Sequence, residues 1–157
     1  MSVENLLLEK FDSPMLQARQ EIEIGYPEKA VKLYVNAKEF GLAGDTETLM
    51  CERDKVRDVA AAEAHRAKAR EYYAIQLEKY VKEGTFRLAG RVAVKMGDNE
   101  QALELFVKGF WYEDASKVAT QLGRAEEAKS YAEKAKIPRT AVMDAAGCFD
   151  WRKHAKR

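Results

Sequence analysis

A short phrase that occurs three times constrains the fold of this chain more than any other feature. In each copy a glycine stands where one helix has to stop, because a backbone with positive φ is least costly at glycine. A glutamate follows in the first turn of the next helix, where it meets the positive end of the helix dipole. A small alanine then allows the two helices to approach closely. The copies are Gly25, Glu28 and Ala30; Gly97, Glu100 and Ala102; and Gly123, Glu126 and Ala128.

The repeated phrase predicts antiparallel helix hairpins that bury their apolar faces by stacking on their neighbours. Capping and helix-breaking residues place further helices between the copies, and no period-2 strand pattern occurs. We therefore expect one all-α domain over 157 residues, with a short helix at 3–11 ahead of the repeats. Its expected parts are a first hairpin (13–41), a long central segment (45–84), a second hairpin (85–110), a third hairpin (111–137) and capping helices with a basic tail (138–157).

The central segment contains no glycine or proline between Thr46 and Glu83. At about 1.5 Å per residue it would form one helix roughly 57 Å long. A break near His65 is the alternative, and we favour the single helix because helix breaks without glycine or proline are less common. Gly41 and Gly44 are expected to end the preceding helix, and Asp45 is expected to cap the long one.

The hairpins resemble those of the tetratricopeptide repeat family. The second helix of that family carries a small residue, an aromatic four positions later and another small residue seven positions later. Its first helix carries an aromatic followed by a small residue and a glycine. The matching residues are Ala30, Tyr34 and Ala37; Ala102, Phe106 and Gly109; Ala128 and Ala135, with Ala132 in place of the aromatic; Phe86, Ala89 and Gly90; and, more weakly, Tyr112, Ala115 and Ser116.

The repeat spacing departs from that family, because Ala102 and Ala128 are 26 residues apart and tetratricopeptide units repeat about every 34. The first unit is also degenerate at Pro14, Gln17 and Ala18. The short spacing looks more like the irregular hairpins of coatomer, clathrin-type and intraflagellar-transport subunits. The resemblance implies a right-handed superhelical array that binds a protein or peptide along the groove formed by the first helices.

Helical phase places four cations of the first helices away from the stacking face: Arg87, Arg91, Lys95 and Lys117. A groove lined by them would suit an acidic peptide. Trp111, within the aromatic run 110–112, is either a hydrophobic anchor for the partner or a packing residue at the joint between hairpins. We favour packing, because three consecutive helical residues cannot all face one way.

The chain shows no pattern typical of an enzyme, a metal site or a cofactor site. His65 is expected to be a surface residue, and neither it nor His154 has a second ligand at metal-binding spacing. Cys51 and Cys148 are expected to be small packed residues and not reactive thiols. The glycines at 41 and 44 lack the lysine and hydroxyl residue of a phosphate-binding loop.

The formal net charge is +1, but four of the last six residues are Lys or Arg and none is acidic. RNA or an anionic surface is therefore an alternative partner, through phosphate contacts and stacking. A solvated capping helix is the other interpretation, and we favour it. The residues concerned are Trp151, Arg152, Lys153, Lys156 and Arg157.

The N-terminus lacks the basic start and apolar core of a signal peptide, and no apolar window is long enough to cross a membrane. Together with two widely separated cysteines, this predicts a cytoplasmic protein with reduced thiols. The alanine-rich central segment leaves open a homodimer formed through that helix.

Overall fold

The computed structural model describes residues 13–146, and in that range the chain is entirely helical and turn, without a strand. The fold class is therefore all-α, as predicted. The chain divides into two compact units within helix α5, and each is described here by itself. Unit 1 is Met1–Gln76 and unit 2 is Leu77–Arg157.

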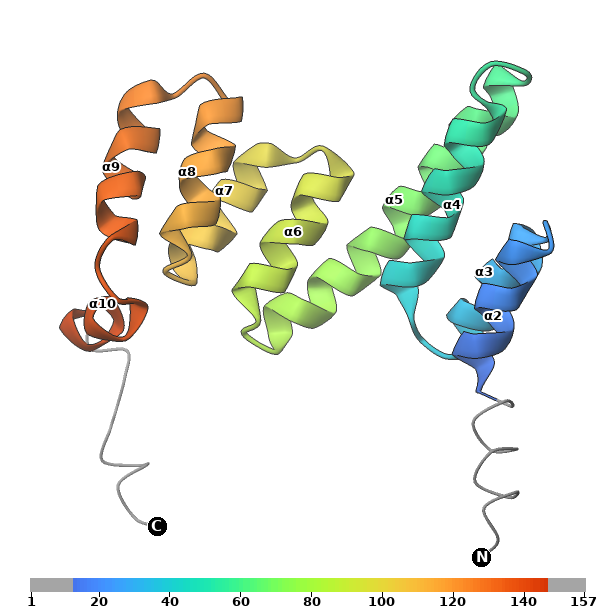
Figure 1. The fold of residues 1–157 in the computed structure, drawn as a ribbon, viewed down its shortest axis with the longest axis horizontal. Coiled ribbons are helices and arrows are strands. Elements are labelled where there is room, and N and C mark those ends of the chain that lie inside the picture. Colours follow the sequence, from blue (N-terminus) through green and yellow to red (C-terminus); the bar gives the residue numbers. More distant parts are fainter. Residues whose placement is uncertain (1–12, 147–157) are drawn as a thin grey trace, which may run out of the picture. The chain divides into compact units, whose positions relative to one another are not determined.

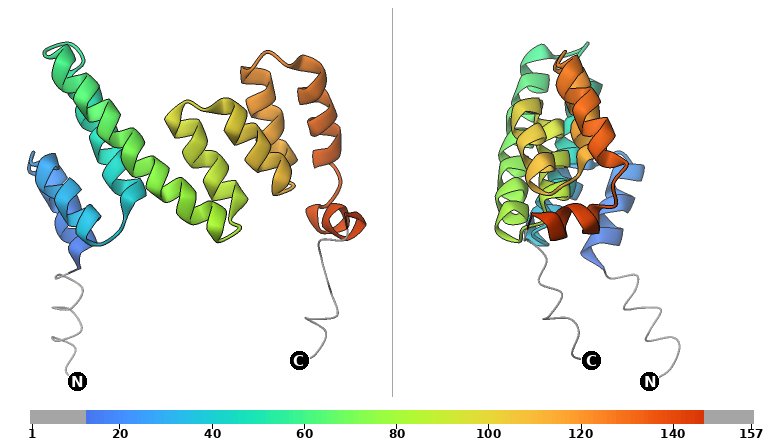
Figure 2. Two further views of the ribbon diagram at one scale, coloured as in Figure 1. Left: turned by 180° about the vertical axis from the view of Figure 1, so that it is seen from behind. Right: turned by 90° about the vertical axis from the view of Figure 1, so that its left-hand side faces the viewer.

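Unit 1 contains α2 (Pro14–Glu23), α3 (Pro27–Asn36), α4 (Phe40–Asp54) and most of α5 (Val59–Lys82). Unit 2 contains the end of α5, then α6 (Phe86–Met96), α7 (Asn99–Lys108), α8 (Tyr112–Gln121), α9 (Ala125–Ala135) and α10 (Arg139–Ala145). Within unit 2, α6 to α9 alternate in direction and each packs on the next, which Figures 1 and 2 show as two consecutive hairpins.

The turns between these helices share one hydrogen-bond pattern. The N–H that follows the turn donates to the carbonyl five residues earlier, as from Asp98 to Ala93 at 3.0 Å and from Trp111 to Phe106 at 2.8 Å. This is the Schellman motif, in which one residue takes a left-handed backbone. That residue stands at positions 84, 97, 110 and 123 in unit 2 and at positions 25 and 38 in unit 1. The repeating element is thus one helix and one turn, 13 residues long, and the 26-residue phrase spans two of them.

Buried alanines recur with the same 13-residue spacing. Ala89, Ala102 and Ala115 are completely buried, and Ala128 is 7% exposed. Ala30 and Ala43 are completely buried in unit 1. A methyl group at each crossing lets neighbouring helices pack closely, as the repeated phrase predicted.

The single long helix expected over 46–83 is wrong. The chain forms α4 and α5, and they are separated by residues 55–58. The carboxylate of Asp58 accepts the N–H of Ala61 at 3.0 Å, which caps the start of α5 without glycine or proline. The break also lies well before His65, where the alternative placed it.

Gly41 and Gly44 do not end a helix, because both lie inside α4. Gly44 instead admits the Tyr73 ring, since a Cβ at this position would come within 2.6 Å of Cε1 of Tyr73. Asp45 is not a cap either. It accepts a hydrogen bond from the Tyr73 hydroxyl at 2.7 Å. Burial raises the pKa of Tyr73 to about 12, so this hydroxyl stays a donor at neutral pH.

His65 was expected at the surface, and this is also wrong. Its side chain is only 16% exposed, and Nδ1 lies 2.6 Å from Oε2 of Glu47, which is itself buried. Nε2 lies 3.6 Å from the carboxylate of Asp54. His65 on α5 therefore joins two carboxylates of α4 and holds the hairpin together near its tip.

The carboxylate of Asp98 caps α7 by accepting the Gln101 N–H at 3.0 Å. Cys51 is buried, as expected for a small packed residue. Ser13 stands at the N-cap of α2, but its side chain makes no capping hydrogen bond. Cys148, His154, the helix expected at 3–11 and the basic tail lie outside the described residues. Within residues 13–146 no helix is both long and apolar enough to cross a membrane.

Lys38 provides a direct test of the turn motif, because it is a non-glycine residue with φ of 60° and an exposed side chain. We expect Lys38→Gly to raise the free energy of unfolding by about 1 kcal/mol, or the melting temperature by about 2–4 °C. Lys32→Gly, within α3, is the matched control and should lower stability by about 1 kcal/mol. Calorimetry of both variants measures the difference, and a loss of stability in Lys38→Gly would contradict the assignment.

The Glu47–His65 contact predicts an asymmetric mutational response. His65→Ala leaves the buried carboxylate without its partner and should lower the free energy of unfolding by about 1–3 kcal/mol. Replacing both residues by leucine should restore much of that loss, because no buried charge remains. Urea unfolding of the single and double variants tests this prediction. Equal destabilisation by both would show that His65 does not compensate the buried Glu47 carboxylate.

Candidate functional site

A groove lies between α6 and α8, the first helices of the two hairpins in the described part of unit 2. Both helices run in the same direction, because α7 returns between them (Figure 1). The groove has a volume of about 410 Å³, within the size range of ligand sites in proteins. It is lined by Arg91, Val94 and Lys95 of α6, Phe106 of α7, and Asp114, Lys117, Val118 and Gln121 of α8.

The floor of the groove is apolar. Phe106 is 2% exposed and Val118 is 4% exposed, so both belong to the core and only their surfaces border the recess. Val94 is 37% exposed and presents its side chain to a ligand. The floor depends on Gly90, because a Cβ there would lie 2.6 Å from Cε1 of Phe106.

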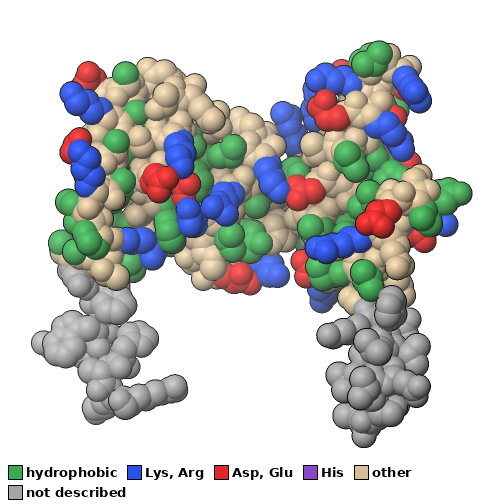
Figure 3. Space-filling view, viewed as in Figure 1, with side chains coloured by type: hydrophobic (Ala, Val, Ile, Leu, Met, Phe, Trp, Pro, Cys, Tyr) green, Lys and Arg blue, Asp and Glu red, His purple; other side chains and the backbone are tan. Residues whose placement is uncertain are grey.

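The rim of the groove carries the charges, and they are not equivalent. Nε of Arg87 donates to Oδ2 of Asp114 at 2.8 Å, which neutralises the end of the groove where α8 begins. One turn further along α6, Arg91 is exposed and has no hydrogen-bond or ion-pair partner among residues 13–146. In the view of Figure 3, Lys and Arg side chains over this part of unit 2 are interspersed with acidic and hydrophobic side chains.

Lys117 on α8 completes the cationic part of the rim. Its ammonium group donates to Glu113 at 2.8 Å, and that hydrogen bond raises the pKa of Lys117. Both side chains of the pair are largely exposed, at 66% and 73%. Exposed pairs of this kind contribute little to stability, so a ligand carboxylate can replace Glu113 at small cost.

Three of the five residues predicted from the sequence line the groove together: Arg91, Lys95 and Lys117. Arg87 contacts Asp114 at the edge and is not a lining residue. The other five lining residues were not predicted from the sequence: Val94, Phe106, Asp114, Val118 and Gln121. The signal was present, because Val94 follows Arg91 by three positions and Gln121 follows Lys117 by four, which places each pair on one helix face.

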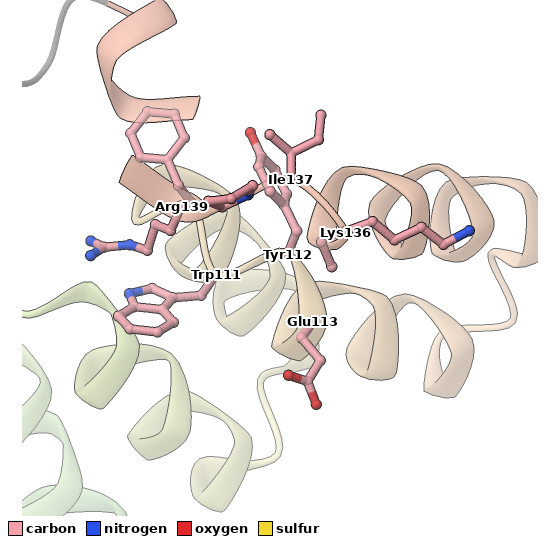
Figure 4. A pocket seen from close by; sticks show the side chains of 9 residues that line it. Trp111, Tyr112, Glu113, Lys136, Ile137 and Arg139 are labelled. Carbon is pink, nitrogen blue, oxygen red and sulfur yellow. The ribbon is translucent and has the colours of Figure 1, made fainter. Parts of the chain in front are cut away.

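Trp111 lies in a different, smaller hollow of about 260 Å³ near the start of α10 (Figure 4). The guanidinium carbons of Arg87 and Arg139 lie 4.4 Å and 4.3 Å from the centre of its ring. Nε of Arg139 also donates to the carbonyl of Gly109 at 3.0 Å. The indole therefore packs at a joint between α6, α8 and α10, which is the role that the sequence favoured for it.

Unit 1 has a hollow of about 420 Å³ between α2 and α3. Its charges are mixed, since Nζ of Lys29 lies 3.7 Å from the Glu21 carboxylate across it. Within residues 13–146, no cluster of three or more His, Cys, Asp or Glu side chains has the geometry to hold a metal ion. The groove of unit 2 remains the stronger candidate, because three cations border its apolar floor and Asp114 is the one acidic residue that lines it.

Comparisons with known proteins do not assign this chain to a family. No protein-family model, no curated protein and no solved structure matches this chain.

Gly90→Ala tests the floor of the groove. The added methyl group would overlap the Phe106 ring, so we expect a loss of about 1–3 kcal/mol in the free energy of unfolding. Combining it with Phe106→Leu should relieve the overlap and destabilise less than the sum of the two single substitutions. Denaturant unfolding of all three variants gives the coupling. Additive effects would show that the two side chains do not meet.

Proposed function

We propose that this protein is an interaction module that binds a segment of another protein in the groove between α6 and α8. The observation that carries the proposal is the groove itself, with exposed Val94 between two buried core side chains and cations along its rim. We further propose that the hairpins belong to a tetratricopeptide-like array. The supports are the helix–turn repeat, the buried small residues at its crossings and the location of the groove on the first helices.

The shape of the site favours a peptide over a small molecule. The groove is open and runs along two helices that lie in parallel, and its polar groups are long, mobile side chains of the rim. Small-molecule sites more often enclose the ligand and orient it with a few fixed polar groups. A bound segment would bury one apolar side chain against Val94 and leave its polar groups near the rim.

RNA or anionic-surface binding through Trp151, Arg152, Lys153, Lys156 and Arg157 stays a prediction from the sequence, because these residues lie outside the described part of the chain. A homodimer and a cytoplasmic location likewise stay predictions. The groove alone is developed further below.

The proposed function is tested with a peptide selected from a random display library on the full-length protein. Backbone amide shifts on adding this peptide should concentrate on residues 91–95 and 114–121. Val94→Gln should weaken its binding by about five-fold or more, because it removes the apolar contact.

Leu88→Gln is the matched control, since Leu88 lies on the same helix, is 41% exposed and does not line the groove. Fluorescence polarisation of the labelled peptide should show unchanged affinity for this variant. If both variants bind equally well, or if the shifts map elsewhere, the groove is not the binding site.

A further inference from the structure

The charges of the groove specify the chemistry of its occupant more narrowly than its shape does. We infer that the groove takes an acidic segment in which a carboxylate neighbours an apolar residue, and that Arg91 is its principal anion-binding side chain. This inference rests on the proposed function, because it names the partner of the same site.

The cations around the groove differ in whether an acidic side chain of the protein already pairs with them. Of the cations around the groove, Arg87 is satisfied by Asp114 at 2.8 Å, and Lys117 is paired with Glu113 at 2.8 Å. Lys95, the other lining cation of α6, is not free either. Arg91 lies one turn beyond Arg87 on α6 and has no such partner in the described part of the chain. A guanidinium presents donors in a planar fork that matches a carboxylate in a bidentate arrangement. Arg91 is therefore the place where an incoming carboxylate gains most.

The position of Arg91 in the groove follows from the contact between Arg87 and Asp114. Arg87 contacts Asp114 across the groove, and the two helices run in the same direction, so Arg91 lies one turn further along α6, opposite Lys117 and Val118 on α8. Val94 lies on the same face of α6 as Arg91, three residues later. A ligand carboxylate bound by Arg91 therefore has its neighbouring side chain near Val94.

The end of the groove near Asp114 is unfavourable for a carboxylate of the ligand. Asp114 is a lining residue, and its side chain is 16% exposed beside the guanidinium of Arg87. The end of the groove near Asp114 therefore offers no unpaired cation, and a ligand carboxylate there would meet a like charge. Acidic residues of the ligand are expected towards Arg91 and Lys117, so the bound segment has a defined orientation.

The test uses the full-length protein and a fluorescein-labelled peptide in which one leucine is flanked on each side by a pair of glutamates. Two analogues carry glutamine or lysine in place of the glutamates. We expect the glutamate peptide to bind about ten-fold or more tightly than the glutamine analogue, and the lysine analogue not to bind. Raising the salt concentration from about 0.1 M to about 1 M shortens the Debye length from about 10 Å to about 3 Å. This should weaken binding of the glutamate peptide more than binding of the glutamine analogue.

Charge variants then assign the contact. Arg91→Ala should weaken binding of the glutamate peptide about ten-fold, and Lys117→Ala should weaken it less, because Glu113 already neutralises much of the charge of Lys117. Lys129→Ala is the matched control. Lys129 is an exposed cation of α9 outside the groove, and its substitution should leave the affinity unchanged. In the double variant Arg91→Glu/Lys117→Glu, the lysine analogue should bind better than the glutamate peptide.

The outcomes separate this inference from the proposed function. If the library-selected peptide binds at the groove but the glutamate and glutamine peptides bind equally, the acidic specificity is overturned and the module function stands. If the glutamate peptide binds equally well to the Arg91→Ala and Lys129→Ala variants, Arg91 is not the anion-binding residue. If no peptide perturbs the groove, the proposed function itself fails.

Discussion

The structure depends on the close crossing of consecutive helices, and two glycines show how this is achieved. Gly90 of α6 receives the ring of Phe106 from α7, and Gly44 of α4 receives the ring of Tyr73 from α5. In both cases an aromatic side chain occupies the space that a Cβ would fill. Each contact joins two antiparallel helices that cannot bury their apolar faces alone. The same contact in unit 2 places Phe106 under the groove, so the packing that holds the hairpin together also forms the floor of the site.

The turn motif explains why the helical hairpins were predicted from the sequence while the length of the repeat was not. Glycine occupies the left-handed position at 84, 97 and 123, and these residues gave helix ends that the structure confirms. Phe110 and Lys38 occupy the same position with φ of 60°. An interpretation based on glycine therefore misses the turns at 38 and 110, and Gly97 to Gly123 looks like one unit of 26 residues where the chain repeats every 13. The buried alanines recur every 13 residues and so mark each helix of the repeat. Alanine is too common in helices for this spacing to stand out in the sequence.

The central segment shows where local sequence rules fail. The break at 55–58 relies on the Asp58 carboxylate, and the two glycines of α4 are used for close packing and not for termination. Glycine at a helix end and glycine at a helix crossing are indistinguishable until the partner ring is known, because both follow from the absence of a Cβ. His65 was misplaced for a related reason, since its burial comes from Glu47 on another helix.

In the candidate site too, the sequence predicts what depends on one helix and misses what depends on a neighbouring helix. Helical phase alone selected Arg91, Lys95 and Lys117, because residues on one helix face share a surface whatever the neighbours are. It could not separate them from Arg87, whose role is decided by Asp114, a residue 27 positions away in the sequence. A cation paired within the protein and a cation awaiting a partner have the same sequence signature, and only the tertiary arrangement of countercharges distinguishes them. Arg87 is paired with Asp114 at 2.8 Å, whereas Arg91 one turn later has no partner in the described part of the chain, and their helical phase does not separate the two.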